Sequence, residues 1–271
     1  MATEENYIVI NRNSWNSRVD AHVNSEFYDV EGFLKGKRTL NEIELGLLGN
    51  IQGKSVLHLQ CHFGMDTLSL GQMGGKVTGM DFSNTAIDKA RELSVHTNIP
   101  ATFICCDLYD LPAHLSDTFD IVYTSYGTIG WLPDLDRWAT IISTFLKPGG
   151  KFVFVEFHPV VWMFDDFFKE IKYNYFKSDS IHETESGTYA DRNAQLNPTS
   201  VTWNHGLGEV LTSLIKKNLM IEKIGEYDYS PYQCFQKCIE FEKNKYRIEH
   251  FGNKIPMVYS LVAVKRVSNQ G

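Results

Sequence analysis

The residues best suited to chemistry follow short apolar runs. The run Val56-Leu-His-Leu59 leads into Gln60-Cys-His-Phe-Gly64, in the position where dinucleotide-binding proteins hold a pyrophosphate. Their G-x-G-x-x-G fingerprint would need glycines at positions 60, 62 and 65, where this chain has Gln60, His62 and Met65. The second of those glycines lets the backbone approach the pyrophosphate closely. The first loop therefore argues against an NAD or FAD site.

Two further loops each carry a carboxylate. Asp81 ends the second apolar run and is followed by Phe82-Ser83; it comes 17 residues after Gly64 (81 − 64), where such a side chain accepts hydrogen bonds from ribose hydroxyls. Asp107 ends the third run beside Leu108, a pair suited to the amino group and ring face of adenine. Together the three loops predict a nucleoside site without a diphosphate.

These loops need a parallel sheet to bring them together. Short apolar runs alternate with longer amphipathic stretches from residue 55 to residue 156, which predicts βαβ units with helices on both faces of the sheet. Ligands bind such sheets outside the carboxyl ends of the strands. The predicted strands are 55–60, 76–80, 101–105, 119–124 and 151–156, and the predicted helices are 66–73, 85–96 and 135–146.

The flanks differ from this middle. Residues 1–50 carry aromatic and polar residues at helical spacing and predict helices over one edge of the sheet. Residues 157–205 are rich in aromatics of mixed periodicity and predict an insertion on the substrate side. Residues 206–271 predict a helix at 208–218 and strands at 219–229 and 256–264. The chain is thus expected to form one domain, with its cofactor-binding core at 51–156.

Composition excludes several classes. The chain has 271 residues, 43% of them hydrophobic, and a formal charge of −7, which lacks the basic footprint of a nucleic-acid-binding protein. No apolar run approaches the roughly 20 residues of a membrane span, and the N-terminus does not resemble a secretory signal. The five cysteines predict reduced, mostly buried thiols, with Cys105 and Cys106 on opposite faces of a strand. A cytoplasmic protein is expected.

The ordered motifs resemble those of the class I S-adenosylmethionine-dependent methyltransferases. The resemblance covers residues 50–157, and the loop Leu59-Gln-Cys-His-Phe-Gly64 is similar to that of an uncharacterised bacterial subset of this family. The motifs that carry it are Val56–Gly64, Val77–Ser83, Cys106-Asp107, Phe119–Val122 and Leu146–Gly150. It implies an α/β, Rossmann-like, mostly parallel sheet of seven strands, the last one antiparallel, and S-adenosylmethionine as cofactor, with S-adenosylhomocysteine as product.

The resemblance also implies roles for individual residues. The loop of Gln60, Cys61, His62 and Gly64 would run under the methionine part of the cofactor, and Asp81 would hold the ribose. Phe82 and Ser83 are further cofactor-binding candidates, although the Ser83 hydroxyl can instead cap the next helix. Asp107 and Leu108 would frame the adenine. Ser125 and Tyr126 would lie near the methionine portion or the methyl group, with Tyr126 as a candidate catalytic residue.

The chain departs from the family at its first loop. The usual acidic residue at the start of the loop is replaced by His58, and only Gly64 remains of three glycines. S-adenosylmethionine has no phosphates, so fewer close backbone approaches are needed and side chains at positions 60 and 62 are tolerable.

Several residues carry alternative interpretations. His58, Cys61 and His62 could bind a metal, but a zinc site usually has a second ligand cluster, so no metal is predicted. Cys234 and Cys238 are expected to pack rather than bind zinc.

Three groups of residues are assigned to the substrate side. His158 is a candidate general base or a hydrogen-bonded structural residue, and His205 a substrate contact or, slightly favoured, a helix-start residue. A lid over the cofactor would use Trp15, His22 and Tyr28, although a helix packed on the sheet is the default. Trp131 and Trp162, with Tyr126, are candidate aromatic walls of the pocket, since aromatic faces suit a sulfonium or a cationic acceptor.

The resulting prediction is methyl transfer to an unidentified small molecule. The fourth strand ends in Ser125-Tyr-Gly-Thr128 and lacks the Asn/Asp-Pro-Pro-aromatic signature of methyltransferases that modify planar amide or adenine nitrogens. Together with the acidic charge, this favours a small acceptor over nucleic acid or membrane. Two alternatives stay open: a catalytically silent cofactor-binding or scaffold protein and, further off, an NAD-dependent oxidoreductase. The sequence gives no oligomeric state.

Overall fold

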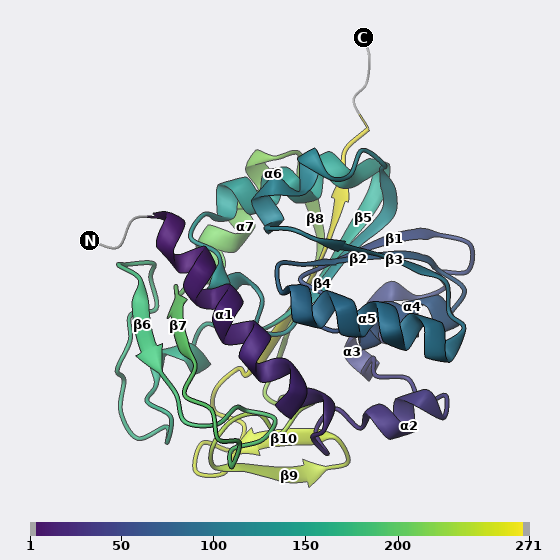
Figure 1. The fold of residues 1–271 in the computed structure, drawn as a ribbon. Coiled ribbons are helices and arrows are strands. Elements are labelled where there is room, and N and C mark those ends of the chain that lie inside the picture. The colour runs from purple at the N-terminus through teal and green to yellow at the C-terminus, as the bar shows by residue number, and fades with distance from the viewer. Residues whose placement is uncertain (1–3, 268–271) are drawn as a thin grey trace.

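A seven-stranded sheet forms the centre of the molecule (Figure 1), in a computed structural model that describes residues 4–267. The strand order is β3-β2-β1-β4-β5-β11-β8. Its strands are β1 (Ser55–Leu59), β2 (Lys76–Asp81), β3 (Ala101–Cys105), β4 (Phe119–Ser125), β5 (Leu146–Phe157), β8 (Leu219–Tyr227) and β11 (Val258–Lys265). The predicted α/β fold and its strands are confirmed. The predicted antiparallel last strand is confirmed too, because β11 runs against both β5 and β8.

Helices cover both faces of the sheet. On one face α3 (Glu42–Leu48), α4 (Met65–Gln72) and α5 (Asn84–Thr97) pack, and on the other lie α6 (Leu135–Phe145) and α7 (Leu207–Lys216). Alternate strand residues point to opposite faces, so Leu57 and Val122 pack in the core with α6, whereas Val56 and Ile121 pack in the core with α3. Burial on both sides explains why the strands read as continuous apolar runs.

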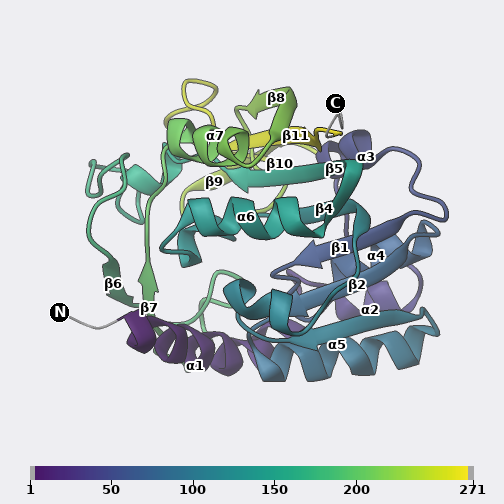
Figure 2. The same cartoon turned by 90° about the horizontal axis from the view of Figure 1, so that it is seen from above.

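The N-terminal helices pack against other elements as well as lying at the edge of the sheet. The long helix α1 (Glu4–Val23) packs against α5 and against the distant strand β7, and the short α2 (Val30–Leu34) also contacts α5 (Figures 1 and 2). The expectation of edge helices is wrong for α3, which lies on a face of the sheet against β5. The reason is its apolar spacing: Ile43, Leu47 and Leu48 are all buried there.

The aromatic insertion divides into two parts. Its later part forms the hairpin of β6 (Ile181–Thr184) and β7 (Thr199–Thr202), which lies alongside α1 (Figure 2). In its earlier part, Phe164 and Phe168 pack on Phe235 and Phe251 from the C-terminal region. The insertion therefore joins the N-terminal helix to the C-terminal segment.

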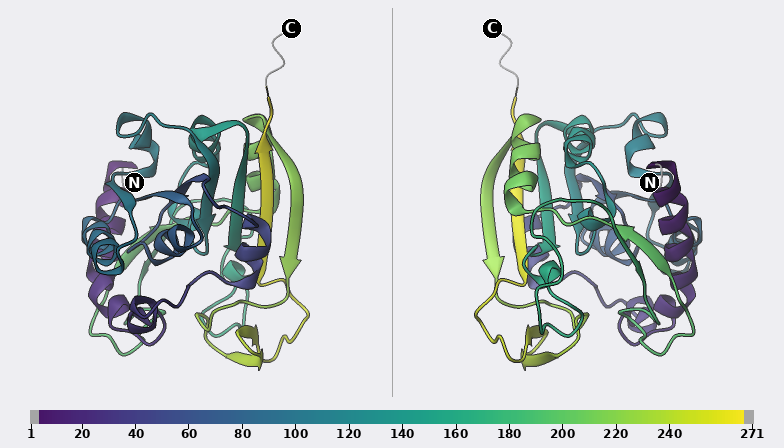
Figure 3. Two further views of the ribbon diagram at one scale, coloured as in Figure 1. Left: turned by 90° about the vertical axis from the view of Figure 1, so that its right-hand side faces the viewer. Right: turned by 90° about the vertical axis from the view of Figure 1, so that its left-hand side faces the viewer.

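A second hairpin escaped sequence-based prediction. It consists of β9 (Cys238–Glu242) and β10 (Lys245–Ile248), visible at the bottom of both views in Figure 3. A signal was present, because apolar and charged residues alternate in Ile239-Glu-Phe-Glu242 and in Lys245-Tyr-Arg-Ile248. Among residues 4–267, no helix has the length and apolar character needed to cross a lipid bilayer.

Candidate active site

The loops that follow β1, β2, β3 and β4 leave the sheet at one edge. Parallel pairing sets Leu59 beside Met80, Asp81 beside Cys105 and Ser125 beside Val155, so the loops that follow these strands leave the same edge. This edge is where open α/β sheets bind their ligands. The sheet therefore brings together the candidate cofactor residues, which lie far apart in sequence.

Asp81 is the best-defined group at this edge. It is only 6% exposed, and its Oδ2 accepts a hydrogen bond from the backbone N–H of His62 at 2.9 Å while Oδ1 accepts from that of Ser83 at 2.9 Å. Burial raises the pKa of Asp81 to about 6, and the backbone hydrogen bonds oppose the rise. The carboxylate is thus ionised at neutral pH and keeps lone pairs for two further donors. This suits the two hydroxyls of a ribose.

The first loop reaches its shape with one glycine. Gln60 and His62 adopt positive φ angles of 53° and 51°, a strained conformation for side chains of this size, and Gly64 follows at 78°. A Cβ at position 64 would lie 2.8 Å from atoms of Ala90 and Phe103, so glycine is required there. Gln60 and His62 therefore replace two of the family's glycines without loss of the turn, and they add two side chains to the site.

The third loop carries a second carboxylate that can accept further hydrogen bonds. Asp107 Oδ1 accepts from the backbone N–H of Tyr109 at 2.8 Å, which caps a short 3-10 helix. Leu108 is buried in the core. From α1, Arg12 donates to the carbonyl of Phe82 at 3.1 Å, so the helix reaches over the ends of β2 and β3. The amide of Asn16 also donates to Asn84 Oδ1, at 2.9 Å.

Glu156, at the end of β5, shapes the loop after β4. This buried carboxylate accepts from the backbone N–H of Thr128 at 2.7 Å, of Ile129 at 3.3 Å and also of Gly127. Burial raises its pKa and the backbone donors oppose the rise. Glu156 carried no predicted role, since a single acid at a strand end does not reveal which backbone amides will face it.

The side chain of Tyr126 is held by contacts inside the protein. Its hydroxyl donates to Glu44 Oε2 at 3.0 Å, and its ring contacts Tyr232 and Phe157. Glu44 is fully buried on α3, and burial raises its pKa to about 7. Tyr126 thus ends in a hydrogen bond to a carboxyl group that titrates near neutral pH.

The two candidate histidines of the substrate side are both held by neighbours. His158 Nδ1 accepts from the backbone N–H of Val160 at 3.2 Å, and its Nε2 lies 3.1 Å from Glu226 Oε1. His205 has Nδ1 3.0 Å from Glu209 and Nε2 2.8 Å from the carbonyl of Leu132. His205 sits one residue before the N-cap of α7, which matches the favoured helix-start interpretation.

Aromatic side chains from three segments cover the first loop. The His62 ring lies 5.1 Å from Trp15, 5.2 Å from His22 and 5.5 Å from Tyr28, centroid to centroid. Trp15 also contacts Trp131 at 5.2 Å. These residues, which sequence analysis assigned to a lid or wall, do converge. Trp162 lies outside this group: it is 41% exposed and packs on Phe157 and Phe235.

The possible metal ligands do not converge. His58 Nδ1 lies 2.8 Å from the hydroxyl of Thr67, and its ring packs on Tyr123, whereas Cys61 is buried among apolar residues of α5. Within residues 4–267 no group of three or more His, Cys, Asp or Glu side chains has the arrangement of a metal site.

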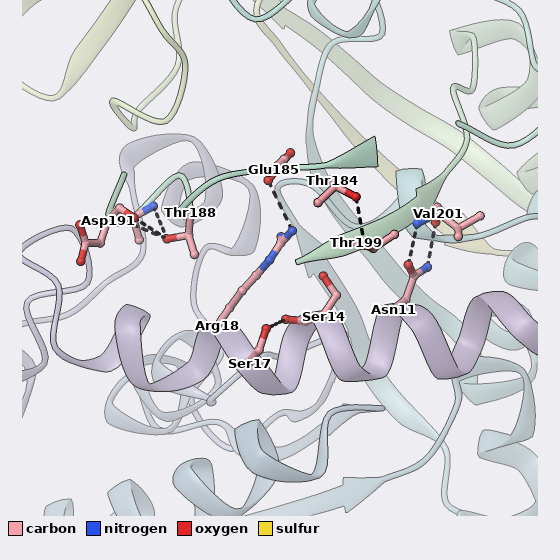
Figure 4. A network of polar contacts seen from close by, with 11 residues as sticks. Asn11, Ser14, Ser17, Arg18, Thr184, Glu185, Thr188, Asp191, Thr199 and Val201 are labelled. Atoms are coloured by element: carbon pink, nitrogen blue, oxygen red, sulfur yellow. Dashed lines mark hydrogen bonds and ion pairs between the residues drawn. The ribbon is translucent and has the colours of Figure 1, made fainter. Parts of the chain in front are cut away.

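Polar residues on α1 were missed by sequence-based prediction. Asn11, Ser14 and Arg18 are buried at the junction of α1 with β6 and β7 (Figure 4). A signal was present, because these positions recur at intervals of three and four residues and so share one helix face. A polar face normally meets water, and only the position of the hairpin reveals that this one is buried.

The seven-stranded sheet with helices on both faces is the Rossmann-like fold that solved methyltransferase structures share. Residues 56–150 match the model of a family described as a methyltransferase domain. Over this part of its length the chain is similar to methyltransferase domains.

Two relatives share about half of the chain. A ubiquinone biosynthesis O-methyltransferase of Proteus mirabilis is 28% identical over 52% of this chain and 62% of its own length. An uncharacterized methyltransferase of Synechocystis is 33% identical over 48% of this chain and 59% of its own length. The chain thus matches less than two thirds of the length of these relatives.

Solved structures share the fold over most of the chain. A geranyl diphosphate C-methyltransferase from Streptomyces coelicolor, in complex with Mg²⁺, geranyl-S-thiolodiphosphate and S-adenosylhomocysteine, superposes with a TM-score of 0.62. It is 16% identical, over 97% of this chain and 99% of its own. A methyltransferase structure from Listeria monocytogenes gives a TM-score of 0.60 at 18% identity, over 82% of this chain and 94% of its own.

Proposed function

We propose that the protein transfers a methyl group from S-adenosylmethionine to a small molecule. The observation that carries this proposal is Asp81, a buried carboxylate with spare lone pairs at the end of β2, tied to a first loop without the glycines that a pyrophosphate would need. The names of the similar proteins, an O-methyltransferase of ubiquinone biosynthesis and a geranyl diphosphate C-methyltransferase, support small-molecule methylation as the class of activity.

The residues present fit the cofactor. Asp81 would accept from the ribose hydroxyls, Asp107 from the adenine amino group, and the loop from Gln60 to Gly64 together with Ser125 would hold the methionine part. Gln60 Oε1 is buried in this loop without a hydrogen-bond partner among the described residues, which supports a polar ligand there. Bound S-adenosylmethionine supplies an electrophilic methyl group on a positively charged sulfur.

The protein's own contribution is positioning and exclusion of water. Methyl transfer is an in-line displacement, so its rate depends on holding the acceptor atom at near-attack distance in a dry site. Trp15, Tyr28 and Trp131 surround the first loop with aromatic faces, which exclude water and favour positive charge.

Tyr126 is the better placed of the two candidate catalytic residues. An acceptor that must lose a proton could pass it to the Tyr126 oxygen while the Tyr126 hydroxyl proton moves to Glu44, whose pKa of about 7 suits a proton acceptor. His158 is less suited, because both ring nitrogens already face Val160 and Glu226.

Calorimetry with S-adenosylhomocysteine tests this function, with NAD as the comparison ligand. We expect S-adenosylhomocysteine to bind with a micromolar dissociation constant and NAD to give no heat of binding. Absence of S-adenosylhomocysteine binding below millimolar concentration would overturn the proposal, and NAD binding in its place would favour the oxidoreductase alternative. S-adenosylhomocysteine binding without transfer of labelled methyl to any acceptor would favour the silent binding protein.

A further inference from the structure

A group of buried polar atoms beside the first loop has no hydrogen-bond partner. Within residues 4–267 the unpartnered atoms include Ser14 Oγ, Arg18 Nε, both ring nitrogens of His22, Gln60 Oε1 and His62 Nε2. Unsatisfied buried polar atoms are rare in folded proteins, because each one costs about 1 to 3 kcal/mol. So many in one place indicate a ligand that supplies the missing partners.

Three of these side chains, those of Arg18, His22 and His62, form one connected cluster through Trp15 and Trp131. The rings of His22 and His62 lie 5.2 Å apart, and His62 contacts Trp15 at 5.1 Å. The guanidinium carbon of Arg18 lies 5.2 Å from the ring centre of Trp15 and 5.7 Å from that of Trp131. The cluster therefore extends from the cofactor loop to Arg18 without a break.

Among the described residues, the positive charge of Arg18 is not balanced by a buried carboxylate in this cluster. It is 3% exposed, and its nearest carboxylate, Glu185 at 3.4 Å, is 54% exposed at its side chain and so is largely solvated. Burial together with Arg18 lowers the pKa of His22 to about 3, and burial, His22 and Arg18 lower the pKa of His62. Both histidines are therefore neutral and offer one ring N–H each. A buried cation with neutral donors beside it calls for an anion.

The position of the cluster assigns it to the acceptor side. Arg18 and Ser14 project from α1 toward the β6–β7 hairpin (Figure 4), and His22 contacts Tyr189, which follows β6. Both α1 and the hairpin lie outside residues 56–150, the part that matches the methyltransferase domain. Only Gln60 and His62 come from the first loop. Because the methyl group of the cofactor is expected beside this loop, the cluster lies next to the expected methyl group.

Resting on the proposed function, we propose that Arg18, His22 and His62 bind a carboxylate group of the methyl acceptor. The planar guanidinium matches a carboxylate, and its Nε is free to donate. The flat faces of Trp15, Trp131 and Tyr28 favour an unsaturated or aromatic body behind that carboxylate. The acceptor class is a small carboxylic acid.

Binding to the protein saturated with S-adenosylhomocysteine tests the inference. The probes are benzoate, phenylacetate and hexanoate, each paired with its uncharged amide and titrated by calorimetry. We expect at least one carboxylate to bind tenfold or more tightly than its amide. In Arg18→Gln we expect that preference to disappear, and in Arg18→Lys, which keeps the charge without the planar fork, to shrink severalfold.

Two matched variants control for structural effects. Glu185→Gln removes the ion pair but keeps Arg18, so carboxylate binding should persist or strengthen. Arg192→Gln changes an exposed arginine of the same insertion, which donates to the carbonyl of Cys234, and should change nothing.

Four results would overturn the inference. These are no carboxylate binding by the loaded wild-type protein, equal binding of acids and amides, unchanged carboxylate binding in Arg18→Gln, or a tenfold loss of S-adenosylhomocysteine affinity in Arg18→Gln. The last result would assign the site to the cofactor's own carboxylate. If the wild-type protein binds no S-adenosylhomocysteine, the proposed function itself fails, which is a separate observation.

Discussion

Asp81 is the residue whose loss should affect the cofactor most directly. It is buried, and two backbone amides fix its orientation, so its remaining lone pairs have a defined direction. We expect Asp81→Ala to weaken S-adenosylhomocysteine binding at least tenfold, about 1.4 kcal/mol, by calorimetry. The control is Asp88→Ala, an exposed acid on the adjacent helix α5 that pairs with Arg91 at the surface. An unchanged dissociation constant in Asp81→Ala would mean that the ribose is bound elsewhere.

Glu44 makes stability depend on pH. Burial raises its pKa from 4.5 to about 7, so the folded state binds this proton more tightly than the unfolded state. The corresponding stabilisation is complete below pH 4.5 and is lost as pH rises through about 7, by at most about 3 kcal/mol.

Replacement of Glu44 by Gln removes this titration. We expect the unfolding free energy of Glu44→Gln to rise relative to wild type between pH 5 and pH 8, measured by urea denaturation. Glu42→Gln, an exposed position on the same helix, should show no such trend. Parallel pH curves for wild type and Glu44→Gln would mean that Glu44 is not buried as a proton-binding group.

At the scale of elements, the turn from β1 into α4 depends on Gly64. Gly53 and Gly64 have similar positive φ angles, 74° and 78°, but a Cβ at position 53 would meet nothing within 4 Å. Gly53→Ala therefore measures backbone strain alone, on the order of 1 kcal/mol. We expect Gly64→Ala to lose about 1 to 3 kcal/mol more, because its methyl group collides with Ala90 and Phe103. Equal losses in chemical denaturation would show that helix α5 yields at this contact.

Helix α1 connects two parts of the molecule that lie on opposite sides of the candidate site. Asn11 donates to the carbonyl of Val201 and accepts from its N–H, both at 2.8 Å, which ties the helix to β7 (Figure 4). On another side, Asn16 Oδ1 accepts from the hydroxyl of Ser83 at 2.7 Å, at the end of β2. The helix thus links the insertion to the cofactor edge.

Breaking one of these ties should loosen the hairpin without unfolding the sheet. We expect Asn11→Ala to destabilise the protein by about 1 to 3 kcal/mol and to speed hydrogen exchange in β6 and β7, while the central strands stay protected. Ser17→Ala is the control, since Ser17 bonds within the helix to the carbonyl of Ser14. Faster exchange in β1 and β4 as well would mean that the hairpin and the sheet unfold as one unit.

The sequence by itself determined the sheet and the edge at which its polar loops gather. The strands can be predicted because a parallel sheet is buried on both faces, so its strands appear as continuous apolar runs between amphipathic helices. Asp81 and Asp107 can be predicted as neighbours because their loops must leave the same edge of the sheet. Trp15, His22, Tyr28 and Trp131, which the sequence offered as a lid over the cofactor or a wall of the pocket, lie beside the first loop, a place that the sequence did not specify.

Tertiary structure alone decided the environment of the remaining polar groups. Glu156 faces three backbone amides, Glu44 is buried beneath Tyr126, and Arg18 is enclosed between two tryptophans. None of this follows from local pattern alone, because the contacts of Glu156, of Glu44 with Tyr126 and of Arg18 with Trp131 each join segments more than 25 residues apart. Whether a polar residue on a helix face meets water or a buried ligand site depends on what packs against that face, and here the β6–β7 hairpin, almost 200 residues further along the chain, covers α1.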